Sequence, residues 1–246
     1  MKNFLYVVFF STNCFTLKAQ VLNDSGATKK ISFKRTIRSL IVPTALIAYG
    51  ASIIHDNGIY SSYQIQRDVR KAFPDFRTKA DSYLEGASYG AMVAMGLSKI
   101  TPSRNWQNSA VRIAKSELLS LVLVRSLKKI THIQRPDSIS YRSFPSGHTA
   151  QLFCTAAVFQ KEVKNAKPWM VVSFYTVAGA VGVMRVLNNR HWASDVIAGA
   201  GIGILSVNIV QLTHKNKWGK KNLSEDLNVI PFFGTQNSGI LLSYKL

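Results

Sequence analysis

Residues 128–150 read KKITHIQRPDSISYRSFPSGHTA and join two apolar segments with helical spacing, 108–127 and 147–162. Pro136 disfavours helical geometry at the residue before it, so the first helix ends here and a polar loop follows. Ser146 is suited to cap the second helix. The stretch therefore predicts two helices joined by a short loop that is rich in cations.

Outward from this stretch, four more apolar segments have helical spacing: 38–55, 83–99, 168–187 and 193–212. Several are about as long as a membrane span, and some are dense in Gly and Ala, which let membrane helices approach closely. We predict an all-α fold, a six-helix transmembrane bundle over residues 38–213, with a short surface helix broken at Pro74. Charges within some segments leave a soluble helical bundle as the alternative.

The two ends of the chain have a different character. Residues 1–19 combine Lys2 with an apolar run, which indicates a secretory signal or an N-terminal anchor, and residues 20–37 form a polar basic linker. Residues 214–246 form a basic tail in which two apolar runs around TQNSG favour a β-hairpin. The two cysteines are too few for a disulfide framework, and no CxxC motif is present to bind zinc.

The charge is strongly unbalanced, because 31 Lys and Arg stand against 12 Asp and Glu, a formal charge of +19. Such an excess suits nucleic acid, an anionic membrane surface or an anionic substrate. The basic residues are scattered between apolar helices rather than gathered in one stripe with aromatic platforms, which argues against nucleic acid. An anionic substrate at an anionic lipid bilayer remains.

A first cluster of cations lies at the end of a predicted helix. Lys128 and Arg135 are seven residues apart, which places them on one helix face two turns apart. A basic stripe beside a membrane surface would have the same pattern.

A second cluster, Ser146-Gly147-His148, starts the next helix. A helix start with a glycine lets backbone N–H groups approach an anion. The alternative is an ordinary capped helix with an incidental histidine.

A third cluster follows the segment 168–187. His191 and Asp195 are four residues apart and share a helix face, so the carboxylate can accept the Nδ1 proton and free the other nitrogen for attack. Arg185 adds a planar donor fork suited to phosphate oxygens. In isolation, such a His–Asp pair is more often a surface hydrogen bond.

In this order and with these spacings, the three clusters resemble the signature of the type 2 phosphatidic acid phosphatase and vanadium haloperoxidase superfamily. One departure is Met184, where the family usually has Ser, and this puts the fine tuning of the phosphate site in doubt. The resemblance implies two sets of site residues. They are the catalytic His191, His148 and Asp195, and the phosphate-binding Lys128, Arg135, Ser146, Gly147 and Arg185.

The resemblance implies hydrolysis of a lipid phosphate monoester or diphosphate without metal or other cofactor. His191 would attack phosphorus to give a phosphohistidine, and His148 would protonate the leaving alkoxide. Candidate substrates are phosphatidic acid, phosphatidylglycerol phosphate, undecaprenyl diphosphate and a lipid A phosphate. A vanadium-dependent haloperoxidase and a soluble exported acid phosphatase are the alternatives within the superfamily.

The distribution of loop charges predicts an orientation in a bacterial inner membrane. The loops opposite the motifs hold fifteen Lys or Arg against eleven on the motif side, which favours a site facing the periplasm. Six spans with an external site require a cytoplasmic amino end, whereas a cleaved signal would export it. Three explanations stay open: the first twenty residues are not cleaved, one candidate helix does not span the membrane, or the protein is a soluble exported form.

Overall fold

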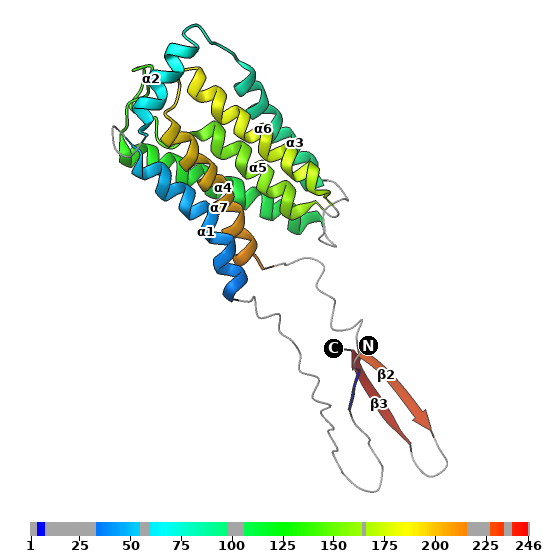
Figure 1. Cartoon of the computed structure of the whole chain (residues 1–246). Coiled ribbons are helices and arrows are strands. Elements are labelled where there is room, and N and C mark those ends of the chain that lie inside the picture. Colours follow the sequence, from blue (N-terminus) through cyan, green and yellow to red (C-terminus); the bar gives the residue numbers. More distant parts are fainter. Residues whose placement is uncertain are drawn as a thin grey trace. The chain divides into compact units, whose positions relative to one another are not determined.

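The computed structural model describes residues 4–7, 33–54, 60–97, 106–163, 166–215, 227–233 and 238–245. Its helices belong to one compact unit, Ile31–Trp218, and its strands to a second, Met1–Lys30 with Gly219–Leu246 (Figure 1). The helices found in these ranges are α1 Phe33–Ser52, α2 Ser62–Ala72, α3 Ala80–Leu97, α4 Trp106–Thr131, α5 Gly147–Glu162, α6 Pro168–Leu187 and α7 Ala193–Thr213. Six correspond to the predicted apolar segments, and α2 is the predicted short helix before Pro74.

Helices α5 and α7 form the centre of the helical unit. Helix α7 packs against α1, α4 and α5, while α5 also packs against α3 and α6 (Figure 1). Close approach requires glycine here, since a Cβ on Gly199 would lie 2.6 Å from the Ser146 carbonyl oxygen. A Cβ on Gly201 would lie 2.6 Å from the Pro43 carbonyl oxygen. The small residues of α7 therefore hold the start of α5 and the middle of α1 against it.

Two of the described helices, α6 and α7, are long and apolar enough to cross a membrane by length and composition. The apolar part of α1, Ile37–Ser52, is shorter. A buried core helix of a soluble protein can meet the same criterion, and about half of the apolar window of α7 is buried. The six membrane spans therefore stay a prediction.

The second unit contains three strands, β1 Phe4–Val7, β2 Leu227–Phe233 and β3 Ser238–Lys245, in the order β1-β3-β2. Both pairs are antiparallel, with Phe4 opposite Lys245 and Leu227 opposite Tyr244. Two paired strands thus lie where the sequence favours a hairpin. The rest of the predicted signal or anchor, and residues 20–32 of the basic linker, lie outside the described residues.

Candidate functional site

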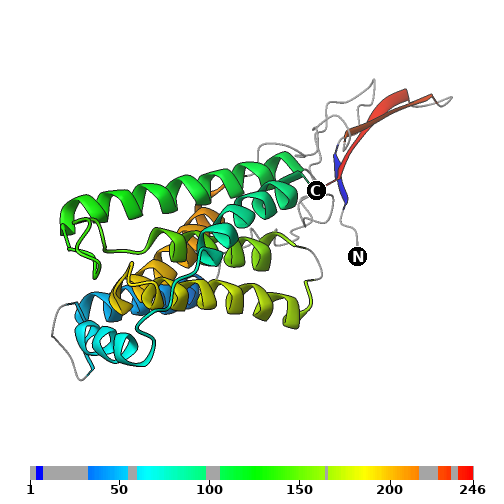
Figure 2. The ribbon, with the colours of Figure 1, turned by 90° about the horizontal axis from the view of Figure 1, so that it is seen from above.

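Three connections lie at one end of the helical unit: 73–79 before α3, 132–146 before α5, and 188–192 before α7 (Figure 2). Hydrogen bonds join the connection 132–146 to the connection 188–192 and to the first turn of α7. The Ser146 N–H donates to the Asp195 carbonyl oxygen at 2.9 Å, and the Trp192 indole donates to the Gln134 carbonyl oxygen at 2.7 Å. The second and third sequence clusters are thereby brought together.

His191 and Asp195 form a buried pair, in which Nδ1 lies 3.1 Å from Oδ2. The same Oδ2 accepts hydrogen bonds from the Trp192 N–H at 2.9 Å and from the Ser143 hydroxyl. Burial lowers the pKa of His191 to about 4, against the opposing effect of Asp195. The imidazole is therefore neutral near pH 7, and its engaged Nδ1 leaves Nε2 for attack.

A tight turn after α6 positions His191. Asn188 ends the helix, and Asn189 has a φ of 60°, a left-handed conformation that asparagine tolerates better than most residues. The Gln66 side chain of α2 donates to the Asn189 side-chain oxygen at 2.7 Å. This contact ties α2 to the turn.

The three predicted phosphate-binding cations gather close enough to repel one another. Lys128, in the last turn of α4, donates to the carbonyl oxygens of Arg142 and Ser143 at 2.8 and 3.0 Å. Arg135 and Arg185 each have a buried Nε with no hydrogen-bond partner within the described residues. Burial and repulsion by Arg185 lower the pKa of Arg135 below its ordinary value. Unsatisfied donors among clustered cations suit an anionic ligand.

Ser146 and Gly147 form the start of α5, as predicted. The Ser146 hydroxyl accepts from the Thr149 N–H at 3.5 Å and from the Thr149 hydroxyl at 2.9 Å. Gly147 is the first residue of the helix. The backbone N–H groups of this first turn form the positive end of the helix dipole, which attracts anions.

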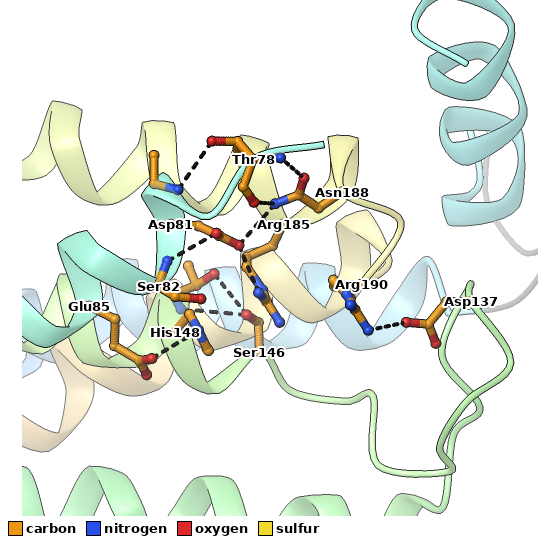
Figure 3. A network of polar contacts seen from close by, with 12 residues as sticks. Thr78, Asp81, Ser82, Glu85, Asp137, Ser146, His148, Arg185, Asn188 and Arg190 are labelled. Atoms are coloured by element: carbon orange, nitrogen blue, oxygen red, sulfur yellow. Dashed lines mark hydrogen bonds and ion pairs between the residues drawn. The ribbon is translucent and has the colours of Figure 1, made fainter. Parts of the chain in front are cut away.

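Helix α3 contributes two carboxylates that the sequence analysis missed (Figure 3). Asp81 Oδ2 lies 2.7 Å from Arg185 Nη1, and Glu85 Oε2 lies 2.9 Å from His148 Nε2. The two acids are four residues apart and share a helix face. An acidic pair at the start of an otherwise apolar helix is the sequence signal that could have found them. Ser143, which holds Asp195, has no such signal.

A cavity of about 760 Å³ opens at this end of the unit. Three predicted site residues line it: Arg135, His148 and Arg185. The other five lie outside its lining: Lys128, Ser146, Gly147, His191 and Asp195. Within the described residues, no group of three or more His, Cys, Asp or Glu side chains could hold a metal ion. Hydrolysis without metal stays a prediction.

Residues 101–218 match the PAP2 superfamily, and this range includes all eight predicted site residues. The chain contains a PAP2 superfamily domain. The domain begins before α4 and ends after α7, so it also covers the connections that carry the three motifs.

Similar proteins include phosphatases named for lipid substrates. A lipid A 1-phosphatase from Porphyromonas gingivalis is 39% identical over 131 residues, which cover 53% of this chain but only 29% of the relative. The crystal structure of Aquifex aeolicus LpxE has a TM-score of 0.48 at 21% identity, covering 65% of this chain and 99% of that one. A transmembrane PAP2 type phosphatidylglycerolphosphate phosphatase from Bacillus subtilis has a TM-score of 0.49 at 19% identity, covering 69% and 94%.

Proposed function

We propose that this chain is a phosphatase that hydrolyses a phosphate monoester or diphosphate of a membrane lipid through a phosphohistidine intermediate. One observation carries the proposal: a neutral, oriented His191 lies in a group of cations that have unsatisfied buried donors. The PAP2 domain supports it, since its match includes every residue that the chemistry requires.

The cations would bind the phosphoryl oxygens, together with the N–H groups at the start of α5. His191 Nε2 then attacks phosphorus, and the bond from phosphorus to the lipid oxygen breaks. His148 gives its proton to the departing alkoxide. In the second step water attacks the phosphohistidine, gives a proton to His148 and releases phosphate, which restores neutral His191.

The α3 carboxylates have positioning roles in this scheme. Asp81 accepts from one Arg185 nitrogen and fixes the plane of the guanidinium, so its remaining donors keep a set direction. Glu85 lies 2.9 Å from His148 Nε2 and fixes the orientation of the ring from which the proton is transferred. Both contacts place a group that touches substrate rather than touching substrate themselves.

Exposed apolar side chains support a lipid substrate. The outer faces of α3, α4 and α6 expose large hydrophobic side chains, among them Val93, Leu97, Leu118, Val122, Trp169, Val172 and Val183. A groove of about 310 Å³ between α3 and α4 is lined mostly by apolar groups, including Met92 and Ile113. Apolar surface of this extent suits lipid chains better than water. We place the protein in the cell envelope, with its site on the periplasmic side of the inner membrane and its basic loops near anionic headgroups.

The test is phosphate release from purified protein in neutral detergent, with phosphatidic acid, phosphatidylglycerol phosphate, undecaprenyl diphosphate and lipid A as substrates. We expect release from at least one lipid, unchanged by EDTA. No release from any of them, or loss of all activity with EDTA, would overturn the proposal. Bromide oxidation in the presence of vanadate and peroxide, without phosphate release, would instead identify a haloperoxidase.

A further inference from the structure

The cavity that holds Arg135 and Arg185 has a second group of cations outside the three motifs. Arg70 lies in the last turn of α2, and Arg77 and Lys79 lie in the segment that leads to α3. All three line the cavity. We refer to Arg70, Arg77 and Lys79 as the α2–α3 cations.

The charges of the α2–α3 cations are not neutralised by the cavity itself. Its two lining carboxylates are already paired: Asp81 lies 2.7 Å from Arg185, and Asp137 lies 3.0 Å from Arg190. Within the part of the chain that the structure describes, the side chains of the α2–α3 cations form no ion pair or hydrogen bond. A concave surface with uncompensated charge of one sign attracts ligands of the other sign.

Hydrogen bonds hold the backbone at Thr78, between Arg77 and Lys79, beside the phosphate site (Figure 3). Asn188, at the end of α6, accepts from the Thr78 N–H at 2.9 Å and donates to the Thr78 carbonyl oxygen at 2.9 Å. The same amide donates to Asp81 at 3.1 Å. Thr78 lies between Arg77 and Lys79 in the chain, so this clamp fixes the backbone from which both side chains extend into the cavity that Arg185 also lines.

The cavity is large enough for more than one anionic group. Its volume of about 760 Å³ is in the range of pockets that enclose whole small-molecule ligands. Arg135 and Arg185 already serve the phosphate that reacts. The α2–α3 cations would face another part of the same headgroup.

We propose that the α2–α3 cations form a second anion subsite, which binds a second phosphate group on the lipid whose first phosphate His191 attacks. The inference rests on the proposed function and narrows its substrate class to lipids that carry two phosphates. A lipid with one phosphate leaves the subsite unfilled and is hydrolysed less efficiently.

The test compares phosphatidic acid with phosphatidylglycerol phosphate of the same acyl chains, in micelles of a neutral detergent. Arg77→Ala/Lys79→Ala is expected to lower kcat/KM for phosphatidylglycerol phosphate by about tenfold to a hundredfold, as for lost charge-assisted hydrogen bonds. Hydrolysis of phosphatidic acid should change by less than about twofold, since its single phosphate does not reach these residues. The control Lys129→Ala/Lys161→Ala removes the same charge from exposed positions outside the cavity and should leave both rates unchanged.

The outcomes separate the subsite from the function. An equal fall for both lipids would overturn the subsite and leave the proposed function standing, because it would reflect general surface charge. The double variant Arg77→Lys/Lys79→Arg keeps both charges and should still hydrolyse phosphatidylglycerol phosphate more efficiently than phosphatidic acid. Loss of that preference in this variant would also overturn the subsite. Failure of the wild-type protein to hydrolyse either lipid, or any other lipid phosphate, would overturn the proposed function itself.

Discussion

Two buried ionic groups lie near opposite ends of α4, and they differ in how their charges are balanced. Arg112, near the start of the helix, bonds both carboxylate oxygens of Glu162 at 2.7 and 2.6 Å, and Gln211 also donates to Glu162. Lys128, near the end of the helix, belongs to the candidate site, where Arg135 and Arg185 keep unsatisfied donors. Sixteen residues separate Arg112 from Lys128. At the helical rise that is about 24 Å.

The comparison separates a structural ion pair from a binding site. In the Arg112–Glu162 pair the planar guanidinium and the carboxylate satisfy each other, so the group needs no ligand. In the candidate site the like charges repel, and burial makes that repulsion costly until an anion arrives. Substitutions should therefore affect folding at one end of α4 and catalysis at the other.

The largest effect is expected from His191→Ala at the site. Loss of the nucleophile should lower kcat for lipid phosphate release by at least about 10⁴-fold. The protein should still fold, because the Trp192 N–H and the Ser143 hydroxyl continue to donate to Asp195, while loss of the buried imidazole lowers the thermal unfolding temperature by a few degrees. Phosphate release and an unfolding curve in detergent check both parts. Residual kcat within about tenfold of wild type would contradict the role of His191.

At the other end, Glu162→Ala leaves Arg112 buried without its partner. It should lower the free energy of unfolding by about 3–5 kcal/mol, while the kcat/KM of the folded protein stays the same. Arg112→Met/Glu162→Met removes both charges and should recover most of the lost stability. Denaturant unfolding followed by assay of the folded fraction is the measurement. A catalytic loss in the double variant would show that the two ends are coupled.

An intermediate loss of activity is expected from Glu85→Gln, which removes the charge of the carboxylate that contacts His148. For lipid substrates kcat should fall by about tenfold, as for the loss of a group that orients a catalytic histidine. Hydrolysis of p-nitrophenyl phosphate should change little, since its leaving group needs no proton. Asp75→Asn, which removes the same charge at an exposed position that does not line the cavity, is the matched control. An equal fall for both substrates would show that Glu85 is structural.

The burial of His191 also determines how kcat/KM and the stability of the fold depend on pH. Its pKa is lowered from 6.5 to about 4, so the acid limb of kcat/KM should lie near pH 4, below which the protonated ring cannot attack. As the pH falls, the unfolded chain takes up this proton at a higher pH than the folded protein does. The contribution of neutral His191 to the free energy of unfolding is therefore complete above pH 6.5 and is lost as pH falls toward 4. A kcat/KM profile from pH 3.5 to 8 tests this. An acid limb at 6.5 would mean that His191 is solvated during turnover.

The smallest effect on activity is expected from Met184→Ser, which restores the residue usual in the family. Met184 packs against the buried cluster of Leu152, Ala178 and Val181 and does not line the cavity. Phosphate release should stay within about threefold of wild type, while lost packing lowers the free energy of unfolding by about 1–2 kcal/mol. A gain above tenfold would show that a hydroxyl here can reach the phosphate.

The sequence could predict only those contacts that join residues close together in the chain. The Ser146 cap and the four-residue spacing of His191 and Asp195 depend on neighbouring positions, and the structure has both contacts. The Asp81–Arg185 bond joins residues 104 apart, and Ser143 reaches Asp195 across 52. Such contacts depend on how the helices pack, which no spacing pattern encodes. For the same reason, spacing patterns did not predict Glu85 or the α2–α3 cations as site residues.

The stereochemical course at phosphorus tests the covalent mechanism most directly. A lipid phosphorothioate monoester that carries two different oxygen isotopes at phosphorus is hydrolysed by the wild-type protein in water of the third isotope, and the configuration of the released thiophosphate is determined. Attack by His191 followed by attack of water inverts phosphorus twice, so we predict net retention. Net inversion would mean that water displaces the lipid directly, and it would contradict the phosphohistidine.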